Sequence, residues 1–229
     1  MPDPSRSAAP LDLEAQIAAV DEVLSTTRSI RRRLDFERPV EPEVLEACID
    51  VAVQAPTGIP PESWRFLVVD APERKRAVAD CYRAALDDLV ARRGGEPPKA
   101  GIRALADRLH EVPALVLVCA EGRPPADDPA FQLAFYGSVL PAAWSLMLAL
   151  RARGLGSTWT TLLVQREREV AELLDIPAGV SLTVLLPVGY MRDAVLRPAA
   201  RAPAQQVSFW NTWGARRGDA GTPESPGAA

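Results

Sequence analysis

Residues 129–153 read PAFQLAFYGSVLPAAWSLMLALRAR, and no charged residue occurs between Pro129 and Leu150. A helix of this length and composition could cross a bilayer. The stretch nevertheless contains polar or helix-weakening residues that hydrocarbon would penalise, namely Gln132, Gly137, Ser138, Pro141 and Ser145. We therefore favour a fully buried central helix, apolar all round, over a membrane span. This helix is expected to stop before Gly154, with Arg151 and Arg153 favourably placed near its C-terminal end.

Apolar runs on both sides of this helix predict strands. Residues 113–120 (PALVLVCA) form a continuous apolar run typical of a buried strand, and 181–190 and 64–70 (WRFLVVD) are similar. Residues 157–163 are expected to form a further strand or an extended turn. Helices are predicted over 12–25, from Glu41 onward, and over 72–93, 97–110 and 166–174. In the helix that begins at Glu41, the expected buried stripe is Val44, Cys48, Val51 and Ala55.

Composition limits the classes of function. The 229 residues carry a net charge of -4 and a pI near 5.2, which argues against a nucleic-acid-binding protein. Three widely spaced cysteines and one histidine favour neither a zinc site nor a disulfide framework, and a reducing cytoplasm is the simplest location. No signal peptide is visible. Residues 1–10 and 215–229 are rich in Pro, Gly, Ala and Ser, so they are predicted to be disordered tails around one domain, 11–214.

Common catalytic motifs are absent. The sequence contains no GxSxG, HExxH or P-loop, and no GxGxxG follows a strand. His110 precedes a strand, where packing at a helix end is a simpler interpretation than catalysis. An enzyme without an evident acid–base set often takes its chemistry from a cofactor.

The segment 27–33 (TRSIRRR) is the strongest local signal of binding. Arg28 and Arg31 are three residues apart with Ser29 between them, so two guanidinium groups and a hydroxyl can converge on a phosphate. Spacing alone supports a solvated basic turn equally well.

Four blocks in order make the chain resemble the FMN-binding nitroreductases. They are RSIRRR, then APTGxxxxxWRFLVV, then YGSVLPAAWSLMLALRARGLGSTWTT, and finally LLPVGY followed by RPAAR and VSFWNTW. The resemblance covers roughly residues 12–213 and implies an α+β sandwich with a mostly antiparallel sheet flanked by helices. It also implies a homodimer in which helix 129–153 is buried at a two-fold interface and a C-terminal extension embraces the partner.

The resemblance assigns roles by position. Arg28, Ser29 and Arg31 match contacts to the flavin phosphate and ribityl chain, with Arg31 reaching the pyrimidine edge of the ring. Thr160 and Thr161 match the turn whose main-chain N–H groups face flavin N5 and O4, where they would stabilise developing negative charge. Further matches are the partner-facing loop Pro56, Thr57 and Gly58, and the second phosphate clamp, Arg201 with Arg197.

Two departures from the family pattern bear on the site. Thr27 stands where the family usually has another basic residue, so one phosphate contact is missing or supplied by Arg32. The usual APSGxNxQPW loop carries Pro60, Glu62 and Ser63 in place of Asn, Gln and Pro. Glutamate here also occurs in the reductive deiodinase branch, which makes Glu62 a candidate substrate or flavin contact; a solvated carboxylate is the alternative.

The implied function is ping-pong transfer of hydride from NAD(P)H, through FMN, to an electron-poor acceptor such as a nitroaromatic or a quinone. No side chain is expected to be catalytic in its own right. Alternatives are a flavin-dependent oxidase of a biosynthetic small molecule, a reductive dehalogenase and a flavin-binding protein without turnover. Neither nucleic acid nor a membrane is an expected partner.

Overall fold

The computed structural model describes residues 12–58, 61–193 and 195–218. The chain divides into two units, Met1–Arg197 and Pro198–Ala229. The expected tail 1–10, the end of the tail 215–229 and Pro60 lie outside the described residues.

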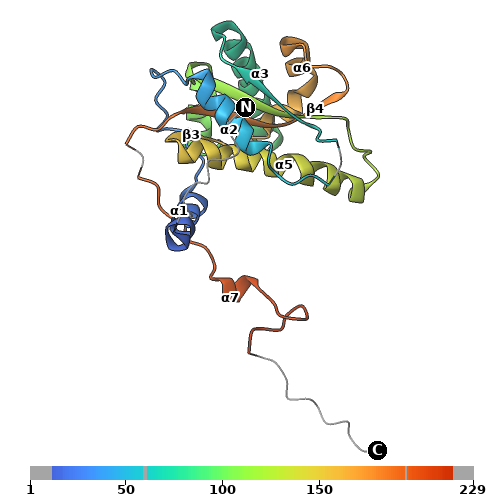
Figure 1. Ribbon diagram of the computed structural model, residues 1–229. Coiled ribbons are helices and arrows are strands. Elements are labelled where there is room, and N and C mark those ends of the chain that lie inside the picture. The colour runs from blue at the N-terminus through green and yellow to red at the C-terminus, as the bar shows by residue number, and fades with distance from the viewer. Residues whose placement is uncertain (1–11, 59–60, 194, 219–229) are drawn as a thin grey trace, which may run out of the picture. The chain divides into compact units, whose positions relative to one another are not determined.

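One antiparallel sheet organises the first unit (Figure 1). Its strands are β1 (Trp64–Val69), β2 (Ala114–Glu121), β3 (Leu155–Ser157) and β4 (Val180–Tyr190), in the order β1-β2-β4-β3. For residues 157–163, the strand alternative is wrong in position, whereas residues 158–161 form an extended turn. Pairing with β4 begins just after Gly154, whose φ of +79° makes the turn out of the preceding helix, and residues 162–166 form a 3₁₀ turn instead.

Helices cover both faces of this sheet. In chain order they are α1 (Leu13–Thr26), α2 (Pro42–Ala52), α3 (Pro72–Arg92), α4 (Ala100–Arg108), α5 (Pro129–Ala152) and α6 (Glu167–Leu174), with 3₁₀ turns at Leu109–Glu111 and Leu162–Arg166. α2 and α5 pack on one face and α3, α4 and α6 on the other. β2 is apolar on both faces because both are covered: Val116 and Val118 face α5, whereas Leu115 and Leu117 face α3. The predicted α+β sandwich is confirmed.

The buried stripe predicted for α2 is wrong in part. Leu45, Cys48 and Ala52 are buried, whereas Val51 is 47% exposed. Spacings of three and four residues place Leu45, Cys48 and Ala52 on one helix face, and that face packs against α5.

α5 is half buried rather than buried all round. Of the described helices, it alone is long and apolar enough to span a bilayer, and half of its most apolar window is inside the fold. Val139, Ala142 and Leu146 contribute to the core, while Leu133 is 77% exposed and Trp144 39%. A second apolar stripe is exposed on α1, at Leu13, Ile17, Val20 and Leu24. Within the first unit, no described element covers these two faces.

The second unit is short. Its helix α7 (Ala204–Val207) precedes a cluster in which the Phe209 and Trp213 rings lie 4.6 Å apart. The guanidinium of Arg216 lies 4.4 Å from the centroid of the Phe209 ring, which is cation–π geometry.

Candidate functional site

The basic loop lies along the edge of β3. The main-chain N–H of Ile30 donates to Ser157 O (2.9 Å), and the buried hydroxyl of Thr158 donates back to Ile30 O (2.7 Å). Ser29 forms a parallel bridge with Ser157. The structure therefore joins two segments that the sequence singled out separately, the loop 27–31 and the turn 155–161.

Gly156 makes this close approach possible. A Cβ atom at this position would stand 2.9 Å from Met191 Cγ and 3.0 Å from both Ile30 Cβ and Leu34 Cδ2. Contacts of this length are too short for a Cβ atom unless its neighbours shift, so glycine lets the basic loop lie directly on the strand without displacing these side chains.

Arg28 is half buried at the end of α1. Its guanidinium donates to Thr27 O (2.5 Å) and Ser25 O (2.9 Å), carbonyls at the C-terminal end of that helix. Arginine has five N–H donors, so these bonds leave donors for an anion. Ser29 is exposed beside it.

Arg31 lies near Tyr82 of α3, a residue that sequence reasoning missed. Tyr82 is 2% exposed, and its hydroxyl lies 3.2 Å from Thr160 Oγ1. Burial raises the pKa of Tyr82, while the Thr160 hydrogen bond and the Arg31 charge lower it. Arg31, Tyr82 and Thr160 thus connect the basic loop to the turn, through a helix whose sequence gave no signal of a functional tyrosine.

The two threonines of the turn are not equivalent. The main-chain N–H of Thr160 donates to Leu185 O (3.1 Å), and Leu185 N–H donates back to Thr160 O (2.8 Å). The Thr160 amide is therefore already engaged within the chain, which conflicts with its expected role toward a flavin. We propose that role for the neighbouring amide of Thr161.

The loop that contains Pro56, Thr57 and Gly58 is anchored on α5. Gly58 N–H donates to the buried Ser138 Oγ (3.0 Å), whose hydroxyl donates to Ala134 O (2.8 Å). Glu62 is exposed farther along the loop, where its carbonyl accepts from Arg65. Ser138, expected only to disfavour a membrane span, thus fixes the position of this loop.

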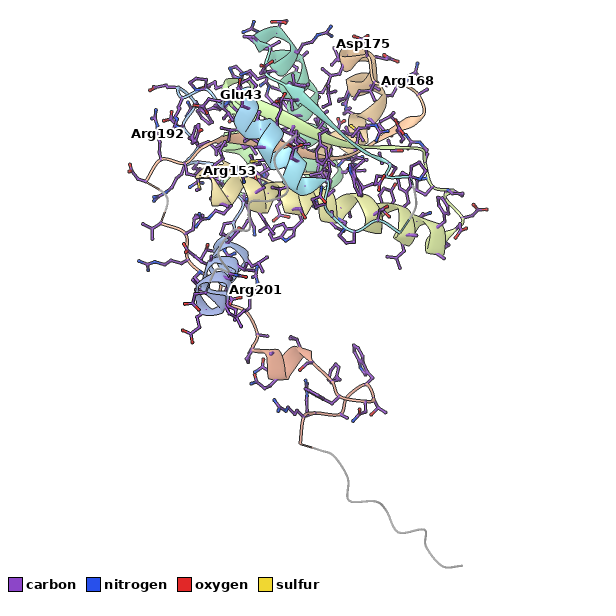
Figure 2. The ribbon with its side chains drawn as sticks, in the orientation of Figure 1. Glu43, Arg153, Arg168, Asp175, Arg192 and Arg201 are labelled. Carbon is purple, nitrogen blue, oxygen red and sulfur yellow. The ribbon has the colours of Figure 1, made fainter. Side chains whose placement is uncertain are left out.

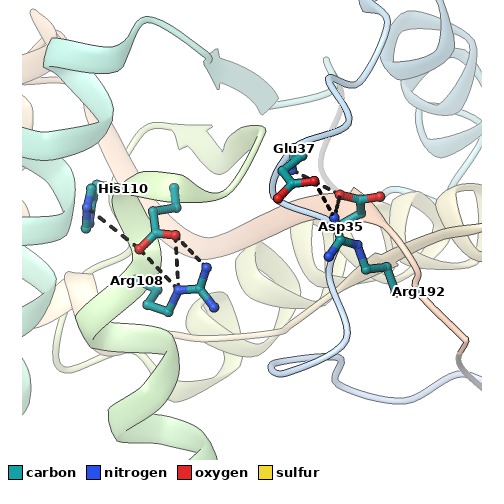
Figure 3. A network of polar contacts seen from close by, with 6 residues as sticks. Asp35, Glu37, Arg108, His110 and Arg192 are labelled. Carbon is teal, nitrogen blue, oxygen red and sulfur yellow. Dashed lines mark hydrogen bonds and ion pairs between the residues drawn. The ribbon is translucent and has the colours of Figure 1, made fainter.

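Arg32 and Arg33 point to a different place. They line a pocket of about 590 Å³ together with Arg108 and Arg192. Figure 3 shows the polar contacts there: Arg192 pairs with Asp35 (2.8 Å) and Glu37 (2.9 Å), and Arg108 pairs with Glu111 (2.6 Å). Arg33 donates to Asp193 O. Because carboxylates pair with Arg108 and Arg192, two of the four arginines of this pocket are already engaged within the chain.

His110 and the cysteines contribute no reactive group here. His110 lies in the 3₁₀ turn after α4, with its Nε2 4.0 Å from Glu111 Oε1. All three cysteines are free and buried. Burial raises the pKa of the Cys119 thiol to about 11, so it is unreactive at neutral pH.

The C-terminal arginines are divided between the two units. Arg197 is the last residue of the first unit and Arg201, labelled in Figure 2, belongs to the second. Both are exposed. Their convergence with Arg28 on one phosphate stays a prediction.

Comparisons with known proteins identify the family. A model of the nitroreductase family matches residues 24–190. The chain belongs to the nitroreductase family. Among curated relatives, the iodotyrosine deiodinase of Thermotoga neapolitana is 31% identical over 188 residues, covering 80% of this chain and 93% of the relative. That of Drosophila melanogaster is 30% identical over 187 residues, covering 77% of this chain and 64% of the relative, slightly under two thirds of its length.

A solved structure shows the same likeness. Iodotyrosine deiodinase bound to FMN and 3-iodo-L-tyrosine aligns with a TM-score of 0.61 at 27% identity, covering 83% of this chain and 97% of that one. The nitroreductase family makes this chain an oxidoreductase. In its loop 27–31, the Arg28 guanidinium and the exposed Ser29 hydroxyl stand on a backbone fixed by β3, and these two groups suit the terminal phosphate of a flavin nucleotide.

Proposed function

We propose that this nitroreductase-family protein binds FMN between the loop 27–31 and the turn 155–161, and that it reduces an electron-poor acceptor with NAD(P)H. The observation that carries the proposal is the pairing of these two segments at Ile30 and Ser157. FMN in the similar deiodinase structure supports the choice of cofactor.

The chain's own residues would bind and orient. Arg28 and Ser29 would hold the phosphate, with Arg197 and Arg201 as a second clamp, and Arg31 would face the pyrimidine edge of the ring. Bound there, FMN would supply hydride transfer, first accepting a hydride from the nicotinamide and later donating one to the acceptor. The Thr161 amide would donate a hydrogen bond to the ring, and Tyr82 would hold the Thr160 hydroxyl beside it.

We further propose that the working unit is a homodimer. The apolar faces of α5 and α1 that are exposed in one chain would be covered by a second copy. Because Ser138 anchors Gly58 on α5, the segment Pro56–Gly58 would lie at that interface and face the partner's flavin. A soluble cytoplasmic dimer acting on small molecules remains our proposal for setting and partners.

Anaerobic titration tests the function. The proposal predicts that NADH or NADPH bleaches the visible flavin absorbance and that a nitroaromatic or a quinone restores it. Arg28→Ala should raise the dissociation constant of FMN about 10- to 100-fold, the range for losing a charge-assisted hydrogen bond. Arg32→Ala is the matched control, because Arg32 belongs to the same loop but lines the other pocket.

Each alternative has its own outcome in the same titration. Flavin reduced by an organic substrate but by neither nicotinamide nucleotide would favour an oxidase. Bound flavin that no donor reduces enzymatically would favour a protein without turnover. A protein that binds no FMN contradicts the proposal altogether.

Reductive deiodination is the second candidate, favoured by the names of the relatives and by Glu62. In that reaction two electrons and a proton convert an aryl iodide to the arene and iodide. Reduced protein mixed with 3-iodotyrosine should then release iodide, and Glu62→Gln should raise the KM for the amino acid more than it lowers kcat. Absence of iodide with rapid reoxidation by a quinone would favour the first proposal.

A further inference from the structure

The pocket lined by Arg32 and Arg33 has no role in the proposed flavin site. It holds about 590 Å³ and lies between the end of α4 and the segments that follow the basic loop and β4. Arg31, the residue proposed to face the flavin ring, directly precedes Arg32 in the chain. A Cβ atom at Gly101 would lie 3.8 Å from both Arg31 Cδ and Arg32 Nε, so the first turn of α4 stands against both side chains. The pocket therefore begins next to the residue assigned to the ring.

Two arginines of this pocket are not paired with a carboxylate. Arg32 has no hydrogen-bond or ion-pair partner among the described residues. Arg33 donates to the main-chain carbonyl of Asp193, which is a neutral acceptor and leaves the charge of the guanidinium uncompensated. Both arginine side chains are exposed. Guanidinium groups in this state bind phosphate oxygens through charge-assisted hydrogen bonds.

Arg108 offers the pocket a flat, fixed surface. Its Nε and Nη2 donate to the Glu111 carboxylate at 3.1 and 2.6 Å (Figure 3). Its guanidinium carbon lies 4.3 Å from the centroid of the Phe36 ring. A planar guanidinium held by a carboxylate and packed on an aromatic ring can stack its other face against a base.

Carboxylates in the same pocket argue against a site for inorganic phosphate alone. Glu37 and Asp193 both line it and would repel a bare anion. The Glu37 side chain is 87% exposed, and the Arg192 group that contacts its Oε2 is shared with Asp35. Carboxylates accept hydrogen bonds from ribose hydroxyls in nucleotide sites. The lining therefore suits a ligand that combines phosphate, a sugar and a base.

We propose that this pocket binds the adenosine phosphate half of the nicotinamide nucleotide. Arg32 and Arg33 bind the phosphates. Glu37 accepts from the ribose hydroxyls, and the Arg108 plane stacks on adenine. The volume lies in the usual range for small-molecule sites. This inference rests on the proposed reduction by NAD(P)H; the alternative is a solvated network that only fixes the chain after β4.

The test compares two hydride donors that differ only in the adenosine phosphate half, NADH and reduced nicotinamide mononucleotide. Flavin reduction in the holoenzyme is measured with each donor at one salt concentration, and NADPH is assayed in parallel. Arg32→Met/Arg33→Met should lower kcat/KM for both dinucleotides about 10- to 100-fold and change that for the mononucleotide less than about twofold. Arg123→Met/Arg168→Met is the matched control, because it removes the same charge from a different pocket, and it should change neither.

ADP binding gives a second readout that needs no catalysis. Titration calorimetry of the holoenzyme should show ADP bound more tightly than inorganic phosphate. Arg32→Met/Arg33→Met should raise the dissociation constant of ADP about 10-fold or more, and Arg108→Ala should also raise it. The FMN content of these variants should equal that of the wild type.

Several results would overturn the inference while leaving the proposed function intact. One is an equal loss of kcat/KM for the mononucleotide and the dinucleotides, which indicates damage at the flavin. Another is unchanged ADP binding in Arg32→Met/Arg33→Met. If that variant does not fold, as judged by thermal unfolding, the same ratio in Arg32→Met decides. Wild-type flavin that no nicotinamide nucleotide reduces contradicts the proposed function itself, and ADP titration then decides on the pocket.

Discussion

Replacing Gly156 with alanine should separate the basic loop from the sheet. The new methyl group would stand 2.9–3.0 Å from atoms of Met191, Ile30 and Leu34. Carbon atoms attract each other at about 3.5–4.0 Å, so these neighbours must retreat by roughly 0.5 Å. Such overpacking costs about 1–3 kcal/mol, and alanine recovers about 0.4–1 kcal/mol by restricting the unfolded chain. We expect a net loss of about 1–2 kcal/mol.

Thermal unfolding of the apoprotein and FMN titration measure this effect. For a chain of this size the loss corresponds to a decrease in Tm of about 2–8 °C. The FMN dissociation constant should also rise, because Ile30 moves together with Ser29. Gly179→Ala is the matched control, since no atom lies within 4 Å of its added Cβ. The reasoning is refuted if Gly156→Ala is as stable as Gly179→Ala and binds FMN equally well.

Three further predictions concern buried polar groups. Ser138→Ala removes the acceptor of Gly58 N–H and should increase hydrogen exchange at that amide, with a stability cost of about 0.5–1.5 kcal/mol. Tyr82→Phe should lower the free energy of unfolding in urea by a similar amount. It should also change the rate of flavin reduction, because the Thr160 hydroxyl loses the partner that holds it beside the proposed flavin site. Cys119 has its pKa raised from 9.0 to about 11, so its contribution to stability is fully present below pH 9 and is lost as the pH rises through 11. That loss is about 3 kcal/mol, and Cys119→Ala should show a shallower decline in stability over this range; identical declines would contradict the assignment.

Much of the fold could be predicted from local pattern. The apolar run of β2 and the charge-free stretch 129–150 of α5 were recognisable because burial on a sheet or a helix face leaves a continuous signature. The short β3 was misplaced because three residues carry no periodicity, and its position depends on pairing with β4. The stripe of α2 was misjudged because two alternative faces of that helix are both apolar, and only contact with α5 selects one.

The candidate site was predictable where residues are adjacent in sequence and not where they meet by folding. Arg28, Ser29 and Arg31 lie within one loop, so their spacing suggested a shared ligand. Tyr82 comes from a distant helix, and nothing in its neighbouring residues indicates that it approaches this loop. The engagement of the Thr160 amide with Leu185 could also not be foreseen, because it is a contact between distant main-chain segments.

The flavin content of the purified protein tests the central claim most directly. Protein denatured under mild conditions should release one FMN per chain, identified chromatographically, and Arg28→Ala should release far less after the same purification. Wild-type protein that is colourless and fails to quench added FMN would contradict the claim that the loop 27–31 and the turn 155–161 form a flavin site.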